Sequence, residues 1–333
     1  MKIVIVNMSR IPVFAYGGTE RVIWDLGKSL VEYGHEVNFL VPKGSTCDFA
    51  EVIEIDPLST WEQQIPKDAD IVHFQFQPTN IQLDIPIVVT EHGNADINKA
   101  LHINTIFLSK NHAERHGSSC YVYNGLDWRN YGEIDWDLKR DHYHFLGKAA
   151  WRLKNVRGAI DIARKLEFPL YVLGGNRFNF KRGIRLTFTP KAKFFGMVGG
   201  QEKLNLLNTS KGLIFPVRWH EPFGLAIIES MYFGCPVFST PYGAIPELVP
   251  QQCGELSANA NKLVQVIRDR QIDPLVCHQH AVDTFNVKQM MYGYLAKYQI
   301  AINGENLNLQ QPYLMETCDR LIWKWWNSDL RIV

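Results

Sequence analysis

The feature that most constrains the fold is a repeated alternation of short apolar runs with longer segments of helical periodicity. Apolar runs of about four to eight residues are typical of buried strands, whereas apolar residues that recur every three or four positions are typical of helices that cover a sheet. Strands that alternate with helices form parallel sheets, because a right-handed crossover returns each strand in the same direction. The sequence therefore predicts an α/β fold.

The alternation occurs twice, with a break near residues 130–140. The first series predicts strands at 2–7, 36–41, 70–76, 85–90, 104–109 and 120–123. The second series predicts strands at 142–147, 169–175, 192–196, 211–217 and 235–240. Helical patterns are expected at 155–166, 287–302 and 312–328. Because a domain usually has about 100–200 residues, the 333 residues are predicted to form two doubly wound Rossmann-like domains.

The charge balance and the apolar runs exclude several classes of protein. The 35 Lys and Arg residues nearly equal the 34 Asp and Glu residues, which argues against a nucleic-acid-binding protein and a generally polybasic membrane surface. The first apolar run is shorter than the about 7–15 residues of a secretory signal, and no run approaches the about 18–20 residues of a spanning helix. We therefore expect a soluble, cytoplasmic protein.

Metal-ligating residues are scattered along the chain. The six cysteines include no C-x-x-C pair, and the eleven histidines have no acidic or cysteine partner at ligand spacing. In a cytosolic protein such cysteines are expected to be buried or free thiols. We expect no metal site and no disulfide framework.

Ligands of doubly wound sheets bind outside the carboxyl ends of the strands, so the loops after the strands are the candidate site. The first such loop contains Gly17 and Gly18 immediately before a helix. Adjacent glycines let backbone N–H groups approach an anion at a helix start, although a plain tight turn explains them equally well. The segment is not the G-x-G-x-x-G of a dinucleotide-binding protein, so hydride transfer loses its main support.

Two further loops contain polar side chains. His92 follows the strand 85–90 and could bind sugar hydroxyls, although a lone loop histidine is more often only structurally satisfied. Lys148, Arg152 and Lys154 cluster after the strand 142–147, where cations could neutralise a diphosphate. Taken alone, these three residues fit a solvated basic loop better.

The fourth loop is the most informative. Residues 215–230 read FPVRWHEPFGLAIIES, with Glu221 in the loop and Glu229 in the second turn of the expected helix. The backbone N–H groups of Phe223, Gly224 and Leu225 would lie at the helix start, which favours an anion. Carboxylates accept hydrogen bonds from pairs of sugar hydroxyls. The alternative is that these glutamates are only a charge near the helix N-terminus and a surface side chain. The Pro-Phe-Gly turn between the two carboxylates argues against this alternative.

These segments resemble the GT4 glycosyltransferases of the GT-B fold over most of the chain. GGTERV and GHEV (17–37) resemble the family's first loop, helix and second strand, and YNGLD (123–127) resembles its interdomain signature. GKAAWRLKN (147–155) resembles the phosphate-binding segment, with Lys148 where the family usually has arginine. EPFGLAIIE (221–229) resembles the E-x₇-E motif, and GCPVFSTPYGAIPEL (234–248) resembles the segment that follows it.

The resemblance implies a role for each matching residue. Glu221 would contact the donor sugar, Glu229 the ribose, and Lys148 and Lys154 the diphosphate as it leaves. His92 would lie near the sugar. The remaining donor-binding positions are backbone groups that would face the phosphates and the sugar, namely Gly17, Gly18, Phe223, Gly224 and Leu225.

The resemblance also implies a domain plan, with two domains that face each other across a cleft. Residues 1–135 would form the acceptor domain, 136–305 the donor domain, and 306–333 a C-terminal helix that crosses back onto the first domain. The last segment contains Trp323, Trp325 and Trp326. We expect these side chains to pack between domains, with an interfacial membrane anchor as the alternative.

The implied activity is a retaining, metal-independent transfer of a hexose from a UDP- or GDP-linked sugar to an acceptor hydroxyl, without a cofactor. The acceptor could be a glycan, a lipid-linked glycan or a small molecule, in glycan, lipopolysaccharide or glycoconjugate biosynthesis. Peripheral contact with the inner face of the membrane stays open. The alternatives are a nucleotide-sugar epimerase or a phosphorylase of the same fold, and a non-catalytic nucleotide-sugar-binding protein.

Overall fold

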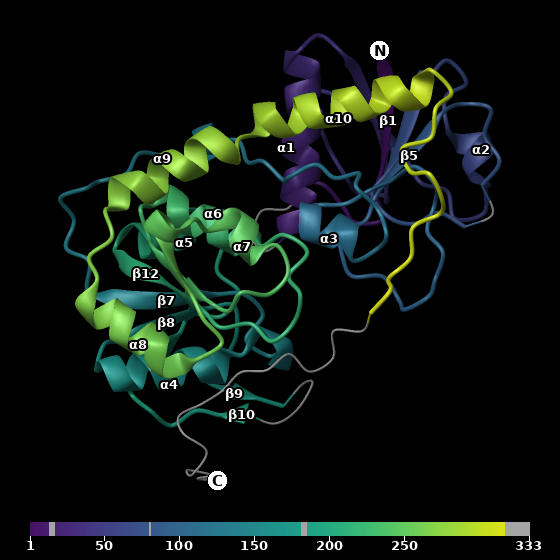
Figure 1. The fold of residues 1–333 in the computed structure, drawn as a ribbon. Helices are drawn as coiled ribbons and strands as arrows, with labels where there is room; N and C mark the ends of the chain where they lie inside the picture. The colour runs from purple at the N-terminus through teal and green to yellow at the C-terminus, as the bar shows by residue number, and fades with distance from the viewer. Residues whose placement is uncertain (13–16, 80, 181–184, 317–333) are drawn as a thin grey trace. The chain divides into compact units, whose positions relative to one another are not determined.

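The computed structural model describes residues 1–12, 17–79, 81–180 and 185–316 (Figure 1). The chain divides into two compact units. The first consists of Met1–Trp128 together with the segment that begins at Phe285, and the second consists of Arg129–Thr284. Each unit is built around its own six-stranded parallel sheet.

The first sheet has the strand order β3-β2-β1-β4-β5-β6. Its strands are β1 (Lys2–Val6), β2 (Glu36–Val41), β3 (Glu51–Glu54), β4 (Ile71–Phe74), β5 (Ile87–Thr90) and β6 (Thr105–Ile106). In the central strand, Ile3 lies opposite Val37 on one side and Ile71 on the other. The order reverses between β1 and β4, and ligands of such sheets bind outside the carboxyl ends of the strands at this switch point.

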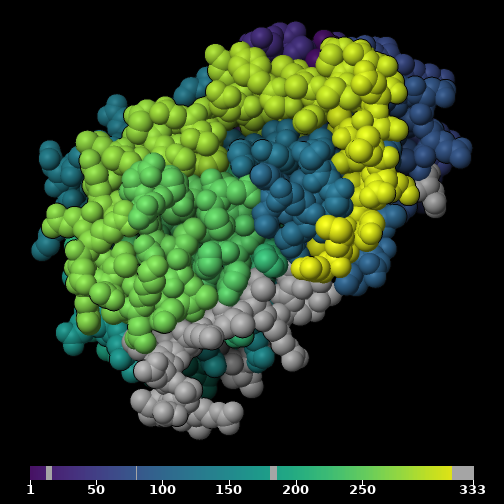
Figure 2. Space-filling view, viewed as in Figure 1, coloured from purple at the N-terminus to yellow at the C-terminus, as the bar shows by residue number. Residues whose placement is uncertain are grey.

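Helices cover the first sheet. They are α1 (Gly18–Glu32), α2 (Trp61–Gln64), α3 (Lys110–Glu114) and α10 (Val287–Ile302). The buried stripe of α1 includes Val22, Leu26 and Leu30, which recur every four residues and so lie on one face of the helix. Helix α10 packs against α1 and β5, and the segment after it continues along the same unit. Figure 2 shows this segment in yellow across the blue residues of the first unit.

The second sheet has the order β11-β8-β7-β12-β13-β14. Its strands are β7 (His142–Leu146), β8 (Leu170–Leu173), β11 (Ala192–Phe194), β12 (Ser210–Phe215), β13 (Val237–Ser239) and β14 (Gly254–Leu256). The switch point lies between β7 and β12. A small antiparallel hairpin of β9 (Phe178–Asn179) and β10 (Arg185–Leu186) lies between β8 and β11 in the chain.

The helices of the second unit connect these strands. They are α4 (Val156–Leu166), α5 (Gly200–Asn208), α6 (Leu225–Tyr232), α7 (Ile245–Leu248), α8 (Ala260–Asp269) and α9 (Pro274–Thr284). The described part of the chain also contains three short 3₁₀ turns, namely η1 (Trp128–Tyr131), η2 (Arg152–Lys154) and η3 (Gln251–Cys253). Within the described residues, no helix combines the length and the apolar character needed to cross a lipid bilayer.

The predicted class, two doubly wound parallel sheets, is confirmed. Two local expectations differ from the structure. Residues 120–123 form a single bridge, between Tyr121 and Phe107, instead of a strand. Residues 312–316 are not helical, because they run as an extended strap whose backbone bonds to the first unit, and the rest of the expected helix 312–328 lies outside the described residues.

The return to the first unit begins at Phe285, whereas the sequence placed 136–305 in the second domain and began the crossing segment at 306. The backbone explains the early return. Leu126 N–H donates to the carbonyl of Phe285 over 3.0 Å, and Val287 N–H donates to the carbonyl of Leu126 over 3.0 Å. A Cβ on Gly125 would lie 2.1 Å from the carbonyl oxygen of Asn286, so only glycine allows this contact. Helix α10 therefore belongs with the first sheet.

Candidate active site

In the second unit, the loops after β7 and β8 touch each other at the carboxyl edge of the sheet. A Cβ on Gly174, which has φ +127°, would lie 2.2 Å from the carbonyl oxygen of Gly147. Ala149 N–H donates to the carbonyl of Gly174 over 2.8 Å. These contacts place the loop that contains Lys148, whose side chain is exposed, at the switch point of the sheet.

The same loop is joined to the loop after β12. Asn155 caps α4 through a 3.1 Å bond from Gly158 N–H to Oδ1, and its Nδ2 donates to the carbonyl of Pro216 over 2.8 Å. Arg218 N–H donates to the carbonyl of Leu153 over 2.7 Å. The two segments that the sequence singled out separately, 147–155 and 215–230, therefore form one structure.

An ion pair stands where these loops meet. Lys154 Nζ lies 2.6 Å from Glu221 Oε2, and the side chains are only 13% and 9% exposed. Trp219 Nε1 donates to the same oxygen over 2.8 Å. Charges in a poorly solvated site interact more strongly than in water, so this pair is held more firmly than an ion pair at the exposed surface.

Aromatic rings surround the ammonium group of Lys154. Its Nζ lies 4.9, 5.6 and 5.1 Å from the ring centroids of Trp219, Trp151 and Phe215, distances at which a ring face attracts a cation. Trp151 and Trp219 also contact each other, with centroids 4.4 Å apart. The ammonium group of Lys154 is therefore packed among three aromatic rings as well as paired with Glu221.

The backbone of Glu221 is fixed by the segment after β13. Ala244 N–H donates to the carbonyl of Glu221 over 2.8 Å, and Gly243 N–H donates to His220 Nδ1 over 3.1 Å. Gly243 has φ +68°, and a Cβ there would lie 2.3 Å from the backbone of Glu221. This contact explains why the motif 221–229 and the segment 234–248 occur together.

Helix α6 starts directly after this turn. Its N-cap is Gly224, with φ +111°, and Phe223 before it is buried. Leu225 is the first helical residue. The first turn of a helix leaves N–H groups outside the intrahelical ladder, and the helix dipole favours an anion there. The expected anion-binding turn therefore lies two residues from Glu221.

Glu229 lies on α6 and is buried among polar groups. Its Oε1 accepts hydrogen bonds from Lys203 Nζ over 2.6 Å and from the hydroxyl of Tyr131 over 2.7 Å. Sequence reasoning missed both partners. Lys203 is buried on the same side of α5 as Leu207, four residues on. A lysine at a core-facing helical position is the signal that could have identified it, because such a lysine needs an acidic partner.

The remaining predicted residues lie in the first unit. Gly17 is the N-cap of α1 and Gly18 is its first residue. His92 follows β5, and its Nε2 lies 2.8 Å from Gln75 Oε1. Seven predicted residues thus lie in the second unit, namely Lys148, Lys154, Glu221, Phe223, Gly224, Leu225 and Glu229, and of these Lys154 and Glu221 form an ion pair. Gly17, Gly18 and His92 belong to the first unit.

A buried chain of hydrogen bonds supports His92. Gln75 Nε2 lies 3.1 Å from His73 Nε2, and His73 Nδ1 lies 2.7 Å from the hydroxyl of Tyr298 on α10. Burial lowers the pKa of His92 to about 4 and that of His73 to about 3, so both rings are neutral at pH 7. With the amide oxygen of Gln75 facing His92, the Nε2 of His92 is the donor of this hydrogen bond.

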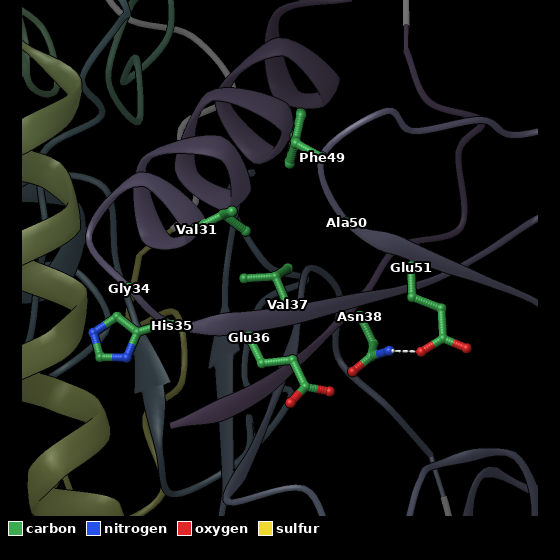
Figure 3. Close-up of a pocket in the computed structure, with 9 residues that line it drawn as sticks. All are labelled: Val31, Gly34, His35, Glu36, Val37, Asn38, Phe49, Ala50 and Glu51. Atoms are coloured by element: carbon green, nitrogen blue, oxygen red, sulfur yellow. Dashed lines mark hydrogen bonds between the residues drawn. The ribbon is translucent and has the colours of Figure 1, made fainter.

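Figure 3 shows a surface hollow in the first unit. It is lined by residues from the end of α1, the start of β2 and the start of β3, namely Val31, Gly34, His35, Glu36, Val37, Asn38, Phe49, Ala50 and Glu51. This is the amino edge of the parallel sheet, opposite to the edge where such folds bind ligands. We therefore do not assign it to the active site. Among the described side chains, no group of three or more His, Cys, Asp or Glu is arranged to hold a metal ion.

Comparison with known proteins agrees with this geometry. Residues 138–270 match the family model of glycosyl transferases group 1. No curated protein sequence is similar enough to the chain to be matched.

Solved structures share the fold over nearly the whole chain. AviGT4, a glycosyltransferase involved in avilamycin A biosynthesis, is 19% identical, with a TM-score of 0.70 over 91% of this chain and 98% of that chain. A glycosyltransferase from Rickettsia africae is 16% identical, with a TM-score of 0.67 over 91% and 99%. Anabaena HepE in complex with UDP-glucose is 18% identical, with a TM-score of 0.63 over 89% and 99%.

These matches agree with the predicted resemblance, through the family model over residues 138–270 and the shared fold of the solved structures. Residues 138–270 are thus similar to the glycosyl transferases group 1 family, and the chain as described has the fold of the GT-B glycosyltransferases.

Proposed function

We propose that the protein is a retaining, metal-independent glycosyltransferase of the GT4 type, which transfers a hexose from a UDP- or GDP-linked donor to an acceptor hydroxyl. The observation that carries the proposal is the Lys154–Glu221 pair, 2.6 Å apart, beside the start of α6. A cation, a carboxylate and a helix N-terminus at the switch point of one sheet fit the diphosphate and the sugar of such a donor.

The chemistry follows from the charge that develops during the reaction. Cleavage of the sugar–phosphate bond places positive charge on the sugar and negative charge on the diphosphate. Lys154, Lys148 and the first amides of α6 would stabilise the diphosphate more strongly as it leaves than in the bound donor, which is the condition for catalysis. Their positive charge would serve the purpose that a divalent cation serves in other transferases.

Glu221 has two partners whose orientation suits a change of role on donor binding. Without donor, its carboxylate neutralises Lys154 and accepts from Trp219. A diphosphate next to Lys154 would take over the neutralisation, and Glu221 would then accept hydrogen bonds from the sugar hydroxyls. We propose front-face attack by the acceptor hydroxyl, with the leaving phosphate accepting its proton, because none of the described side chains in this site is an evident nucleophile.

Glu229 is proposed to bind the ribose of the nucleotide. HepE was solved with UDP-glucose, and another neighbour, starch synthase IV, was solved with ADP, which supports a nucleotide-diphosphate sugar as the donor class. Gly17, Gly18 and His92 remain proposed donor-binding residues of the first unit. We further propose that the reaction takes place in the cytoplasm and serves the synthesis of a glycan or glycoconjugate.

Nucleotide binding and turnover are measured separately to test the proposal. In a thermal-shift panel of UDP-, GDP- and ADP-sugars, the true donor at about 100 times its Kd should add about 2.7 kcal/mol of stability. NMR of the product should then show the anomeric configuration of the donor retained. An inverted product would refute retention, and the absence of stabilisation by every nucleotide sugar would refute the donor class.

Three alternatives give different results in the same assay. An epimerase would convert the donor without an acceptor, and a phosphorylase would require inorganic phosphate. A non-catalytic protein would bind a donor and show no turnover with any acceptor. The complete set of Lys148, Lys154, Glu221 and Glu229 favours catalysis.

A further inference from the structure

His73 is a buried polar side chain between apolar neighbours in the first sheet. It lies on β4, opposite Ile5 of β1 and Val88 of β5, and all three residues are fully buried. Residues paired across parallel strands in this way point to the same face of the sheet. Helix α10 covers this face, because it packs against β5 and the hydroxyl of Tyr298 lies 2.7 Å from His73 Nδ1 (Figure 1).

The packing of the core does not by itself account for this histidine. A buried imidazole costs free energy unless its two nitrogens are hydrogen-bonded, and each such bond adds little net stability, whereas an apolar side chain would need no partner. The cost is offset here by Tyr298 at Nδ1, and by Thr90 Oγ1 and Gln75 Nε2, which lie 2.7 and 3.1 Å from Nε2. Four buried polar side chains thus occupy a place where apolar ones would pack, which points to a purpose other than stability.

The hydrogen bonds lead from this core to the carboxyl edge of the sheet. Gln75 follows β4 and is 7% exposed, and its amide faces His73 through Nε2 and His92 through Oε1, which lies 2.8 Å from His92 Nε2. His92 follows β5, at the edge where ligands of such sheets bind. A line of hydrogen bonds therefore joins Tyr298 on α10 to His92 through His73 and Gln75.

This line of bonds holds one side of the His92 ring. Its Nε2 donates to Gln75, and no hydrogen bond joins its Nδ1 to a residue in the described part of the chain. An imidazole that is held at one nitrogen by a neighbouring group keeps one tautomer and one orientation, and presents its other nitrogen to a ligand. In His92 that other nitrogen is Nδ1.

We propose that Gln75, His73 and Tyr298 are positioning residues, which hold His92 with Nε2 turned into the first unit and Nδ1 available to the donor sugar. They act through His92 and not by contact with the donor. Helix α10, whose residues come late in the chain, thereby completes the support of a donor-binding residue. This role rests on the proposed function, in which His92 lies near the sugar.

The position of the ring proton tests the line of bonds without any turnover. Two-bond ¹H–¹⁵N NMR spectra of the full-length protein distinguish the two tautomers of a histidine, and His92→Gln identifies the signals of His92 by their loss. The unchanged protein should show the His92 proton on Nε2 only. Gln75→Met keeps the length of the side chain and removes the amide, so it should show a mixture of both tautomers.

Tyr298→Phe and Tyr294→Phe form a matched pair, because both tyrosines are buried on α10 and both hydroxyls bond to the sheet. Tyr294 bonds to Thr90 over 3.0 Å and does not belong to the line that reaches Gln75. Tyr298→Phe should lower kcat by about three- to tenfold and Tyr294→Phe by less than about twofold, although each loses one buried hydrogen bond. Equal kcat values in the two variants would overturn the part assigned to α10.

The coupling between Gln75 and His92 separates positioning from general damage. Gln75→Met should lower kcat by about tenfold, leave the calorimetric Kd of free UDP or GDP unchanged, and have no further effect in protein that already carries His92→Ala. An equal loss of kcat with and without His92, or a single His92 tautomer in Gln75→Met, would overturn the positioning role. If the unchanged protein turns over no nucleotide sugar, the proposed function fails, while the NMR comparison still decides whether these bonds hold His92.

Discussion

At the scale of single residues, the candidate site consists of two carboxylates, each paired with a lysine. Lys154 Nζ lies 2.6 Å from Glu221 Oε2, and Lys203 Nζ lies 2.6 Å from Glu229 Oε1. Removing one member of a buried pair leaves an uncompensated charge and costs about 3–5 kcal/mol, whereas the intact pair adds little net stability. Ligand binding therefore explains such pairs better than stability does. Substitutions in the first pair should lower turnover, whereas substitutions in the second pair should weaken nucleotide binding.

Breaking the first pair should abolish turnover. Lys154→Ala and Glu221→Ala are each expected to lower kcat by about 10²–10³-fold, because charge stabilisation at the leaving group is lost. Lys139→Ala, at an exposed position of the same unit, should leave kcat unchanged. Circular dichroism must show folded protein in each case. Full turnover in either pair variant would remove that residue from the proposed mechanism.

Breaking the second pair should affect nucleotide binding more than chemistry. Lys203 and Tyr131 hold Glu229 through one oxygen, so Lys203→Met is expected to weaken UDP or GDP binding by about tenfold while kcat at saturating donor changes little. Tyr131→Phe removes a single hydrogen bond and should weaken binding by about three- to tenfold. Lys203→Arg keeps the charge and should restore part of the affinity. Equal calorimetric Kd values for Lys203→Met and the unchanged protein would contradict this role.

At the scale of elements, the most consequential arrangement is α10 on the first sheet. Tyr298 and Tyr294 point their hydroxyls at His73 and Thr90, over 2.7 and 3.0 Å. These bonds bury neutral histidine under a helix that comes from the far end of the chain. The stability of this arrangement therefore depends on pH through the protonation of the imidazole.

The expected sign follows from the pKa values. Burial lowers the pKa of His73 to about 3, whereas an unfolded histidine has a pKa of about 6.5, so the unfolded state binds an extra proton between these values. The contribution of neutral His73 to the free energy of unfolding is therefore fully present above about pH 6.5 and is lost as the pH falls toward 3. His92 and His116, each with a pKa lowered to about 4 by burial, act in the same direction. Asp25, with its pKa raised by burial to about 7, acts in the opposite direction.

Urea titrations at pH 4.5 to 6.5 can isolate the contribution of His73. The variant His73→Gln should reduce the slope of unfolding free energy against pH by about 1.4 kcal/mol per pH unit, the equivalent of one proton. Tyr298→Phe is the control, because it removes a buried hydrogen bond and lowers stability by about 1–3 kcal/mol while the imidazole still titrates. An unchanged slope in His73→Gln would show that His73 does not remain neutral in the folded protein.

At the scale of the whole molecule, sequence pattern and structure agree where the physics is local. Buried strands such as β1 are apolar runs in the sequence and could be predicted. Glu221 and Glu229 could be chosen as candidate residues because a Pro-Phe-Gly turn and the start of α6 lie between them in the chain. The sheet that α10 covers could not be predicted from the sequence. The pattern of its apolar residues predicts a helix with one buried side, but it does not say against which sheet that side packs. Lys203 was missed because its partner, Glu229, is 26 residues away in the chain. Trp219 was missed because its bond to Glu221 depends on the conformation of the loop that contains both residues.

The positive charges of the whole site determine whether the reaction needs a divalent cation. If Lys148, Lys154 and the α6 N-terminus supply the positive charge for the leaving diphosphate, turnover should be unchanged by an excess of EDTA and should not rise on addition of Mg²⁺. Lys154→Arg should retain more activity than Lys154→Met, which loses the charge although it keeps a similar volume. Loss of activity in EDTA that Mg²⁺ restores would show that a bound cation, and not these groups, neutralises the diphosphate.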